Sequence, residues 1–293
     1  MSAPAITVVT PSFNQGRFIR RTIESVLSQG VPGLEYLIFD AVSTDETASV
    51  LREYSGRLTA TIEKDAGQAD AVNKGLRAAR GDIIGWLNSD DVYYPGALTA
   101  VLDVFAANPW IDVIYGDADH IDEHDGVMEA YYTEPFNYEK FKDVCFLCQP
   151  AVFFRRSVVA RFGPLDASLR YCMDYDYWLR ILWDKPPFFL RRRLAGSRMY
   201  GDNKTLGSRE AVHHEILQML KHKFGEPPIR WVYNYGHAML AGRGLTRETP
   251  EKDRMFVGAL TELCEQAFAQ YFGRIPASER QTLDDWRAYA GRS

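Results

Sequence analysis

The sequence predicts an α/β fold, a mostly parallel sheet flanked by helices, with a helical C-terminal extension. Over residues 6–105, short apolar runs alternate with segments in which apolar residues recur at i, i+3 and i+4. This alternation is typical of βαβ units, whose right-handed crossovers build a parallel sheet. From residue 208 onward the spacing is helical and strand patterns become rare.

Apolar runs rich in β-branched residues predict strands, and the stretches between them predict helices. The strands are expected at residues 6–10, 36–39, 59–63, 83–87, 113–115 and 151–154. The helices are expected at residues 18–27, 44–54, 68–79, 95–105, 173–183, 210–224 and 252–272. Ser43 and Glu46 fit a capping box before the second helix, and His124-Asp125-Gly126 predicts a hairpin turn.

Composition is typical of a soluble globular protein. The chain has 293 residues, of which 46% are hydrophobic and 25% charged, and its formal net charge is −5. This balance gives no electrostatic reason to expect nucleic acid as a partner. Every apolar run is shorter than about 18 residues and no basic segment precedes the first strand, so neither a membrane-spanning helix nor a secretory signal is expected. The expected location is cytoplasmic.

Asp90 and Asp91 directly follow the buried strand expected at 83–87. Open α/β sheets keep their ligand crevice at the carboxyl ends of the strands, where Asp40 and Asp65 also stand. Adjacent carboxylates repel each other, and a divalent cation held together with substrate phosphates offsets that repulsion. The alternative is that the two aspartates only cap the next helix.

Cys145 and Cys148 form a CxxC, which suggests zinc, but no second pair with metal-ligand spacing accompanies them. Free cysteine packs as a small hydrophobe, so residues 145–148 are interpreted as part of a buried apolar segment. The small number of cysteines, four, fits a reducing compartment.

Several motifs, in order along the chain, resemble those of the family 2 glycosyltransferases, which have the GT-A fold. They are Thr10-Pro11-Ser12-Phe13-Asn14, residues 40–45 (DAVSTD), residues 65–75 (DAGQADAVNKG), residues 81–96, Gln149-Pro150 and residues 173–180 (MDYDYWLR). The resemblance implies a catalytic domain over residues 1–205, with a nucleotide-binding half at 1–117 and an acceptor half at 118–205. It does not cover the helical extension at 206–293.

The resemblance also implies roles for individual residues. Asp174 falls where the family has its general base, with Asp176 next in line. Asp90 and Asp91 fall in its metal motif, which holds Mn²⁺ or Mg²⁺, and the sequence leaves open which of the two binds the ion directly. Asp40 falls where a carboxylate accepts from a uracil ring. The implied nucleotide site comprises Thr10, Pro11, Phe13, Asn14, Asp40, Asp65, Gln68, Asn73, Asn88, Ser89 and Asp90.

Three positions depart from the family pattern. Met173 stands where a glutamate usually precedes the base, Ala41 where a glycine usually follows the carboxylate of the second strand, and Tyr200 where a histidine is often a third metal ligand. The metal site is therefore expected to be weak or completed by water.

Trp231, Tyr233 and Tyr235 stand close to Arg230 in the helical extension. Aromatic and basic residues together suit an interface with an acceptor, a partner or a membrane surface, whereas ordinary core packing is the alternative. A weak peripheral contact with the inner face of a membrane is left open, and the sequence does not predict an oligomeric state.

Together these features predict an inverting, metal-assisted glycosyltransferase. It would move a sugar from a nucleoside-diphosphate donor, a UDP-sugar, to a hydroxyl of a glycan or lipid-linked acceptor in surface-polysaccharide or other glycan biosynthesis. The alternative is a non-catalytic protein of the same fold that binds sugar nucleotides or glycans. A HAD-type phosphohydrolase would need an aspartate in place of Val42. Nucleotidyltransferases and redox dinucleotide enzymes would need a glycine-rich loop after the first strand, which residues 11–14 do not provide.

Overall fold

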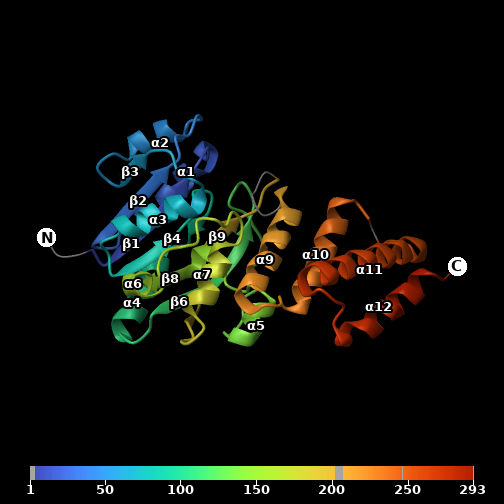
Figure 1. Ribbon diagram of the computed structural model, residues 1–293. Coiled ribbons are helices and arrows are strands. Elements are labelled where there is room, and N and C mark those ends of the chain that lie inside the picture. The colour runs from blue at the N-terminus through green and yellow to red at the C-terminus, as the bar shows by residue number, and fades with distance from the viewer. Residues whose placement is uncertain (1–3, 202–206, 246, 293) are drawn as a thin grey trace. The chain divides into compact units, whose positions relative to one another are not determined.

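The computed structural model describes residues 4–201, 207–245 and 247–292 of the protein (Figure 1). The chain divides into two compact units. One comprises Met1–Phe141 and Cys145–Tyr200, and the other comprises Lys142–Val144 and Gly201–Ser293. The first is an α/β domain and the second is helical, and each is described by itself.

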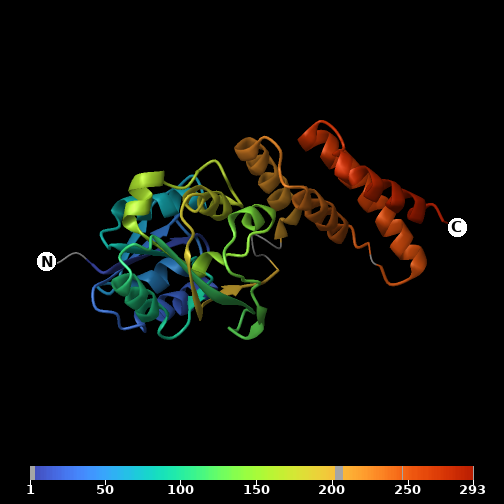
Figure 2. The same cartoon turned by 90° about the horizontal axis from the view of Figure 1, so that it is seen from below.

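The first unit is organised around a nine-stranded sheet in the order β3-β2-β1-β4-β8-β6-β9-β5, with β7 paired to β6 (Figures 1 and 2). The strands are β1 (Ile6–Ser12), β2 (Leu34–Asp40), β3 (Thr59–Ile62), β4 (Ile83–Trp86), β5 (Val92–Tyr93), β6 (Val113–Ile121), β7 (Val127–Ala130), β8 (Val152–Arg155) and β9 (Phe188–Arg198). Strands β3, β2, β1 and β4 are parallel, as are β6 and β9. Strands β5, β7 and β8 are antiparallel to their neighbours. The predicted α/β class, a mostly parallel sheet flanked by helices, is confirmed.

Helices pack on both faces of the parallel half of the sheet. Up to residue 181 the helices are α1 (Gly16–Leu27), α2 (Thr47–Glu53), α3 (Gln68–Ala78), α4 (Ala97–Ala107), α5 (Tyr138–Asp143), α6 (Arg156–Phe162) and α7 (Met173–Ile181). Successive residues of a strand face opposite layers. Val8 therefore packs in the core shared with α1, α2 and α4, whereas Val9 meets α3. A Cβ added at Gly75 of α3 would stand 2.1 Å from Val9 Cγ1, so α3 lies directly on the sheet.

The carboxyl ends of the parallel strands meet at one edge of the sheet. In the register of the strands, Ser12 stands beside Asp40, and Asp40 beside Ile62. The loops that follow β1, β2, β3 and β4 are therefore neighbours, although they are far apart in the sequence. Most of the predicted nucleotide and metal residues belong to these loops or to the strand ends before them.

The predicted capping box before α2 is wrong. This helix begins at Thr47, and its N-cap residue, Glu46, makes no side-chain capping hydrogen bond. Ser43 turns back instead and donates from its backbone N–H and its hydroxyl to Asp40, at 2.9 and 2.6 Å. The N–H of Thr47 is satisfied by Asp45, at 3.0 Å. Val42, directly before Ser43, has a φ of 63°, and Thr44, Asp45 and Glu46 lie between Ser43 and the first helical residue.

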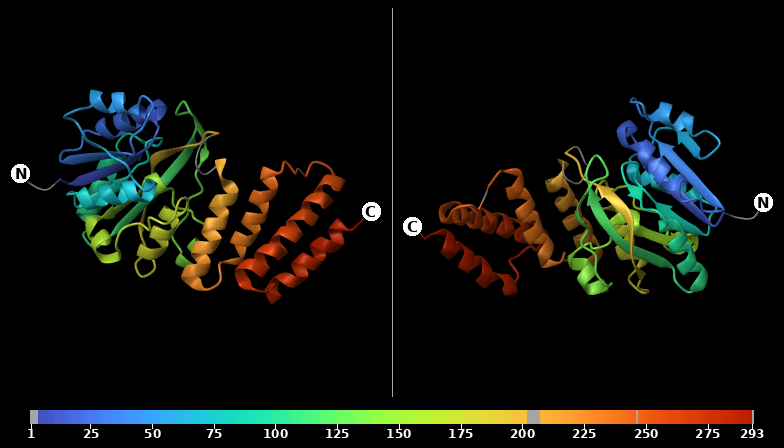
Figure 3. Two further views of the ribbon diagram at one scale, coloured as in Figure 1. Left: turned by 45° about the horizontal axis from the view of Figure 1, so that its top comes forward. Right: turned by 180° about the vertical axis from the view of Figure 1, so that it is seen from behind.

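The second unit contains the helices α9 (Arg209–Phe224), α10 (Ile229–Gly242), α11 (Pro250–Phe272) and α12 (Ala277–Ala290). Each of these helices packs against the next one along the chain (Figure 3). Helices α9 and α11 agree with the expected ranges, and Pro227-Pro228 separate α9 from α10. No separate bounds were predicted for α10 and α12.

The aromatic residues of α10 pack inside the helical unit. Trp231 is 7% exposed and donates from Nε1 to the Lys142 carbonyl at 2.9 Å. The Tyr233 ring lies 5.9 and 5.5 Å, centroid to centroid, from the rings of Phe268 and Trp286. Core packing therefore accounts for both residues. None of the helices in the described ranges combines the length and the apolar character that crossing a membrane requires.

Candidate functional site

The acid loop, residues 88–91, connects β4 to β5 and carries the two adjacent aspartates. Thr22 of α1 holds it from one side, because its Oγ1 donates to two backbone carbonyls of the loop at 2.9 and 2.8 Å. Arg198, at the end of β9, holds it from the other side. Its backbone N–H donates to Asp91 Oδ1 at 2.9 Å, and its Nε donates to the Asp90 carbonyl at 2.7 Å. The acid loop is thus fixed by two elements that are distant in sequence.

The two aspartates have different surroundings. Asp91 is 4% exposed, and its carboxylate accepts from the Arg198 backbone and, at 3.3 Å, from Asn88 Nδ2. Asp90 is only partly buried, and its Oδ2 accepts from the Tyr200 hydroxyl at 2.8 Å. Burial raises the pKa of both carboxyls, and the charge of Asp90 raises the pKa of Asp91 further. A cation beside the pair would relieve this repulsion, and Asp90 is the more accessible partner.

The donor chemistry of this pair fits a hard divalent cation such as Mg²⁺ or Mn²⁺. Such an ion prefers oxygen ligands and is commonly held by one or two carboxylates together with substrate phosphates and water. Across the described ranges, no three or more His, Cys, Asp or Glu side chains gather to form a metal site. The protein therefore offers a two-carboxylate site that a phosphate ligand would complete.

Asn88 joins the acid loop to two further segments. Its Oδ1 accepts from Gln68 Nε2 at 2.8 Å and from Trp86 Nε1 at 3.0 Å. Its Nδ2 donates to Gln149 Oε1 at 2.9 Å, and Gln149 donates in turn to the Trp86 carbonyl at 2.6 Å. Because Gln68 is the first residue of α3, this amide network brings two predicted nucleotide residues, Gln68 and Asn88, into contact.

The loops after β1 and β2 are hydrogen-bonded to each other. The Asn14 N–H donates to Ser43 Oγ at 2.7 Å, and Asn14 Oδ1 accepts from the Thr44 N–H at 2.8 Å. Asp40 is 1% exposed, and both of its carboxylate oxygens accept from Ser43. Asn14 and Val42 have φ angles of 52° and 63°. A left-handed conformation is unusual for a β-branched residue and marks local strain, which often occurs at ligand-binding loops.

Apolar side chains are exposed at the ends of β1, β2 and β3. Phe13 is 58% exposed, Val42 43% and Ile62 49%. The strained turn holds Val42 outward, and Ala41, which replaces the family's glycine, has no left-handed φ. An exposed aromatic ring next to a buried carboxylate suits a flat ligand with one polar edge.

The contacts of Thr10, Pro11 and Asp65 are with other residues of the protein. Thr10 and Pro11 are buried on β1, and Thr10 Oγ1 lies 3.2 Å from Tyr36 Oη. Asp65 Oδ1 accepts from the Gly67 N–H at 2.9 Å, in the loop that leads into α3. These three residues therefore shape the protein surface at the carboxyl edge of the sheet.

Asn73 supports a different segment. It is 4% exposed, and its amide exchanges two hydrogen bonds with the backbone of Leu165, at 2.9 and 2.8 Å. Asn73 thereby ties α3 to the segment before α7. The described contacts of its side chain are those of a residue that positions this segment.

Asp174 lies in the first turn of α7, where its Oδ1 accepts from the Tyr175 N–H at 2.8 Å. Cys148 connects it with the acid loop. Burial raises the pKa of the Cys148 thiol, and the charges of Asp91, Cys145 and Asp174 raise it further. Asp91 of the acid loop and Asp174 therefore both contribute to the electrostatic environment of this one thiol.

The CxxC segment is buried, as the sequence predicts. Phe146, Leu147 and Cys148 are 0%, 1% and 2% exposed. Burial, followed by the charge of Asp174, raises the pKa of the Cys145 thiol. Both thiols are therefore neutral, and Cys145 is the half-buried member of the pair.

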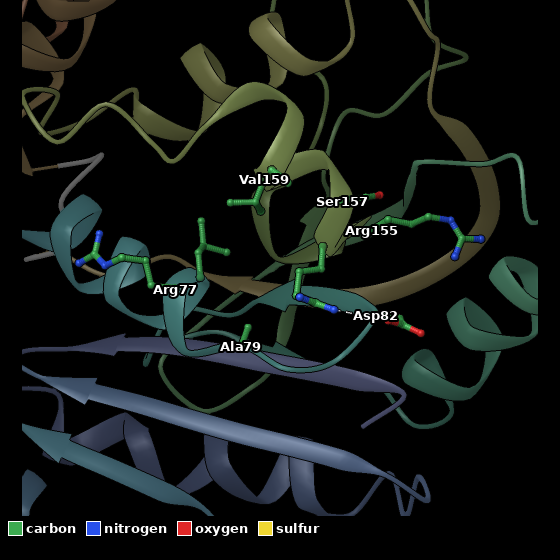
Figure 4. A pocket seen from close by; sticks show the side chains of 9 residues that line it. Arg77, Ala79, Asp82, Arg155, Ser157 and Val159 are labelled. Atoms are coloured by element: carbon green, nitrogen blue, oxygen red, sulfur yellow. Dashed lines mark ion pairs between the residues drawn. The ribbon is translucent and has the colours of Figure 1, made fainter. Parts of the chain in front are cut away.

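A separate cavity of about 540 Å³ lies beyond the amino end of β4 (Figure 4). Arg77 and Arg155 extend from it in opposite directions. Arg155 donates to two backbone carbonyls at 2.7 and 3.0 Å, and Arg156 pairs with Asp82 at 3.8 Å. Since its cations do not converge, this cavity is a poorer candidate than the carboxyl edge of the sheet.

Residues 7–163 match the Glycosyl transferase family 2. The chain belongs to this family. The match runs from β1 to the end of α6 and so includes the acid loop and the parallel strands β1 to β4. Asp174 and Tyr200 lie beyond it.

Two relatives and one solved structure show how far the similarity extends. The chain is 26% identical over 218 residues to an uncharacterized glycosyltransferase of Rickettsia typhi, covering 69% of this chain and 66% of that protein. It is 27% identical over 221 residues to chondroitin synthase of Escherichia coli, covering 73% and 32%. The chain thus spans less than two thirds of the length of either relative. TarS of S. aureus, solved with UDP-GlcNAc, has a TM-score of 0.61 and 15% identity over 97% of this chain and 88% of that one, which is a likeness of fold.

Sequence reasoning missed Thr22 and Arg198 as residues that fix the acid loop. Thr22 lies in the helix expected at residues 18–27, and the helical pattern does not point to a contact with the acid loop. Arg198 contacts Asp91 across 107 positions of the chain, so no local spacing points to it. Its full burial, at 1% exposure, is the structural signal of its role, since arginine is rarely buried unless paired.

Proposed function

We propose that this family 2 protein transfers a sugar from a nucleoside-diphosphate donor, a UDP-sugar, to an acceptor hydroxyl, with inversion at the anomeric carbon. The observation that carries the proposal is the acid loop with its Asn88 amide network at the carboxyl edge of the parallel strands. The charges of Asp91 and Asp174 both act on the Cys148 thiol, which supports adding Asp174 to the same site. The likeness of fold to TarS, which was solved with UDP-GlcNAc, supports a nucleotide-sugar donor. Similarity to chondroitin synthase supports a glycan acceptor.

The nucleoside would lie over the ends of β1 and β2. Phe13 and Val42 offer an apolar surface there, and Asp40 offers the acceptor for a ring N–H. Gln68 and Asn88 would lie beside the ribose and diphosphate, because their amides meet at the amino end of α3. In this proposal Thr10, Asp65 and Asn73 act by shaping the site.

Asp90 would hold Mg²⁺ or Mn²⁺ directly, and Asp91 would support it from inside the loop. The reason is that both Asp91 oxygens already accept protein hydrogen bonds, whereas Asp90 is the partly exposed member of the pair. When bound, the ion supplies charge stabilisation for the departing diphosphate.

Asp174 would act as the general base. Its carboxylate accepts the proton of the acceptor hydroxyl while the hydroxyl oxygen forms a bond to the anomeric carbon. The bond from that carbon to the diphosphate oxygen breaks at the same time, and its electron pair leaves with the nucleoside diphosphate. A single displacement of this kind inverts the anomeric centre, and the transition state has oxocarbenium character.

A panel of UDP-, dTDP- and GDP-sugars, incubated with the protein and Mn²⁺ and with glycan acceptors, tests the proposal. The measurement is release of nucleoside diphosphate. We expect the wild-type protein to release UDP from a UDP-sugar. We expect the Asp90→Asn variant to show no such release. Nucleotide binding without release from any donor would instead favour a non-catalytic binding protein.

A further inference from the structure

Arg17, in the first turn of α1, is a cation beside the acid loop that the sequence patterns did not single out. Its guanidinium carbon lies 4.5 Å from the centroid of the Tyr200 ring and 4.5 Å from that of Phe18. The hydroxyl of the same Tyr200 donates to Asp90 Oδ2 at 2.8 Å. One aromatic side chain therefore separates the guanidinium from the proposed metal ligand.

Three arginines surround this corner of the site, and they differ in how free they are to meet a ligand. The Arg198 side chain is fully buried and pairs with Asp125, and the Arg21 side chain is 31% exposed and pairs with the same carboxylate at 3.2 Å. The Arg17 side chain is 47% exposed, and its carboxylate contact is with Glu123 at 3.2 Å, itself 49% exposed. Exposed ion pairs of this kind contribute about 0–1 kcal/mol, so a ligand with higher charge density displaces them readily.

A divalent ion at Asp90 and Asp91 is already balanced by the two carboxylates. The negative charge of a bound diphosphate therefore calls for a further positive group. Arginine meets this need well, because its planar fork donates two parallel hydrogen bonds to phosphate oxygens. The stack on Tyr200 and Phe18 restricts the side chain, so less conformational entropy is lost when a ligand binds. Tyr200 thus supplies an aromatic support for a cation at the position where a metal-ligating histidine would otherwise stand.

We propose that Arg17, supported by Tyr200, binds the diphosphate group of the nucleotide donor next to Asp90. This inference rests on the proposed function, since it names a residue that recognises the donor at that same site. The alternative is a structural role, in which Arg17 only packs on Tyr200 and pairs with Glu123.

Calorimetric titration of UDP and of uridine in the presence of Mn²⁺ separates the two roles. Arg17→Gln should weaken UDP binding about tenfold or more, as expected for lost hydrogen bonds to a charged group, and leave uridine binding unchanged. Arg17→Lys keeps the charge without the fork and should recover part of the loss. Arg20→Gln is the matched control, because Arg20 lies on the same helix, is 43% exposed and pairs with Glu53 away from the acid loop. This control should bind both ligands as the wild type does.

The titration results distinguish a phosphate-binding Arg17 from a structural one, and they also test the proposed donor. UDP binding by Arg17→Gln within about twofold of the wild type overturns the inference and leaves the proposed function standing. An equal loss of UDP and uridine binding assigns Arg17 a structural role and also overturns it. Wild-type protein that binds no UDP with Mn²⁺ refutes the proposed donor itself. A thermal melt of each variant checks that its fold is intact.

Discussion

The Tyr200 hydroxyl donates a 2.8 Å hydrogen bond to Asp90 Oδ2 and accepts one of 3.1 Å from Gln15 Nε2. The residue after β9 is thereby connected both to the acid loop and to the turn that starts α1. Tyr200 is 7% exposed and its ring packs 4.9 Å from that of Phe18. The phenol is a fixed part of the site, and it satisfies one carboxylate oxygen of Asp90.

Replacing Tyr200 with histidine should strengthen metal binding. An imidazole beside Asp90 is a common metal ligand, whereas a phenol with a raised pKa stays protonated. One added ligand contributing about 1.4 kcal/mol would lower the half-saturating Mn²⁺ concentration about tenfold. The measurement is the thermal unfolding temperature as a function of Mn²⁺ concentration at a fixed concentration of UDP.

Tyr200→Phe is the control for this prediction, because it removes the hydroxyl without supplying a ligand. It should not lower the Mn²⁺ requirement. If both variants lower it equally, loss of the hydrogen bond to Asp90 is the cause, and the imidazole is not a ligand.

UDP should stabilise the protein only when Mg²⁺ or Mn²⁺ is present. The two carboxylates of the acid loop repel a diphosphate unless a cation lies between them and the phosphates. At about 100 times its dissociation constant, UDP with metal should add about 2.7 kcal/mol to the free energy of unfolding. Thermal shift with and without EDTA measures this. Equal stabilisation in both conditions would show that the diphosphate binds without a metal.

UDP should bind more tightly than GDP. Uracil presents its N3–H to Asp40 on a single ring, whereas guanine would have to bring its N1–H there with a second fused ring. A base that does not reach Asp40 loses a hydrogen bond worth about 1–3 kcal/mol. Ser43 already donates twice to Asp40, but a carboxylate has about four acceptor positions, so a further donor fits. Titration of both nucleotides with Mn²⁺ checks the order of affinity. Tighter binding of GDP would reject the role of Asp40.

The parallel half of the sheet was predictable because its signals are local. Each strand there is an apolar run that ends at a polar loop, and parallel pairing brings those loops together whatever the intervening sequence. The same reasoning located the acid loop and the end of β2. It erred at α2, where the pattern of Ser43 and Glu46 fits a cap but tertiary contacts with Asp40 take precedence.

The second half of the domain was less predictable because its pairings are distant. Strand β9 joins β6 and β5, and through it Arg198 and Tyr200 reach an acid loop more than a hundred positions earlier. No periodicity encodes such a contact. Helices α10 and α12 fall inside the stretch from residue 208 onward, for which helical spacing is predicted, but no separate bounds were predicted for them.

Asp174→Asn should abolish transfer while leaving the fold and UDP binding intact. Asp174 lies in the first turn of α7, and the structural alternative is that it only interacts favourably with the helix terminus, a contribution of about 1 kcal/mol. Asparagine is also a good residue at a helix start, but it cannot accept a proton. The substitution therefore removes the chemical role and keeps most of the structural one.

If Asp174 is the base, the variant should lose about 100-fold or more in transfer rate, with its thermal stability within about 1 kcal/mol of the wild type. Asp176→Asn is the comparison, because Asp176 lies on the same turn but is 8% exposed and pairs with Arg180 at 3.5 Å. Its loss should cost stability more than turnover. An Asp174→Asn variant within about threefold of wild-type turnover, together with an inactive but folded Asp176→Asn, would move the base to Asp176. Since both aspartates belong to one helical turn that begins beside Cys148, either result keeps the base on α7 and tests which carboxylate faces the acceptor.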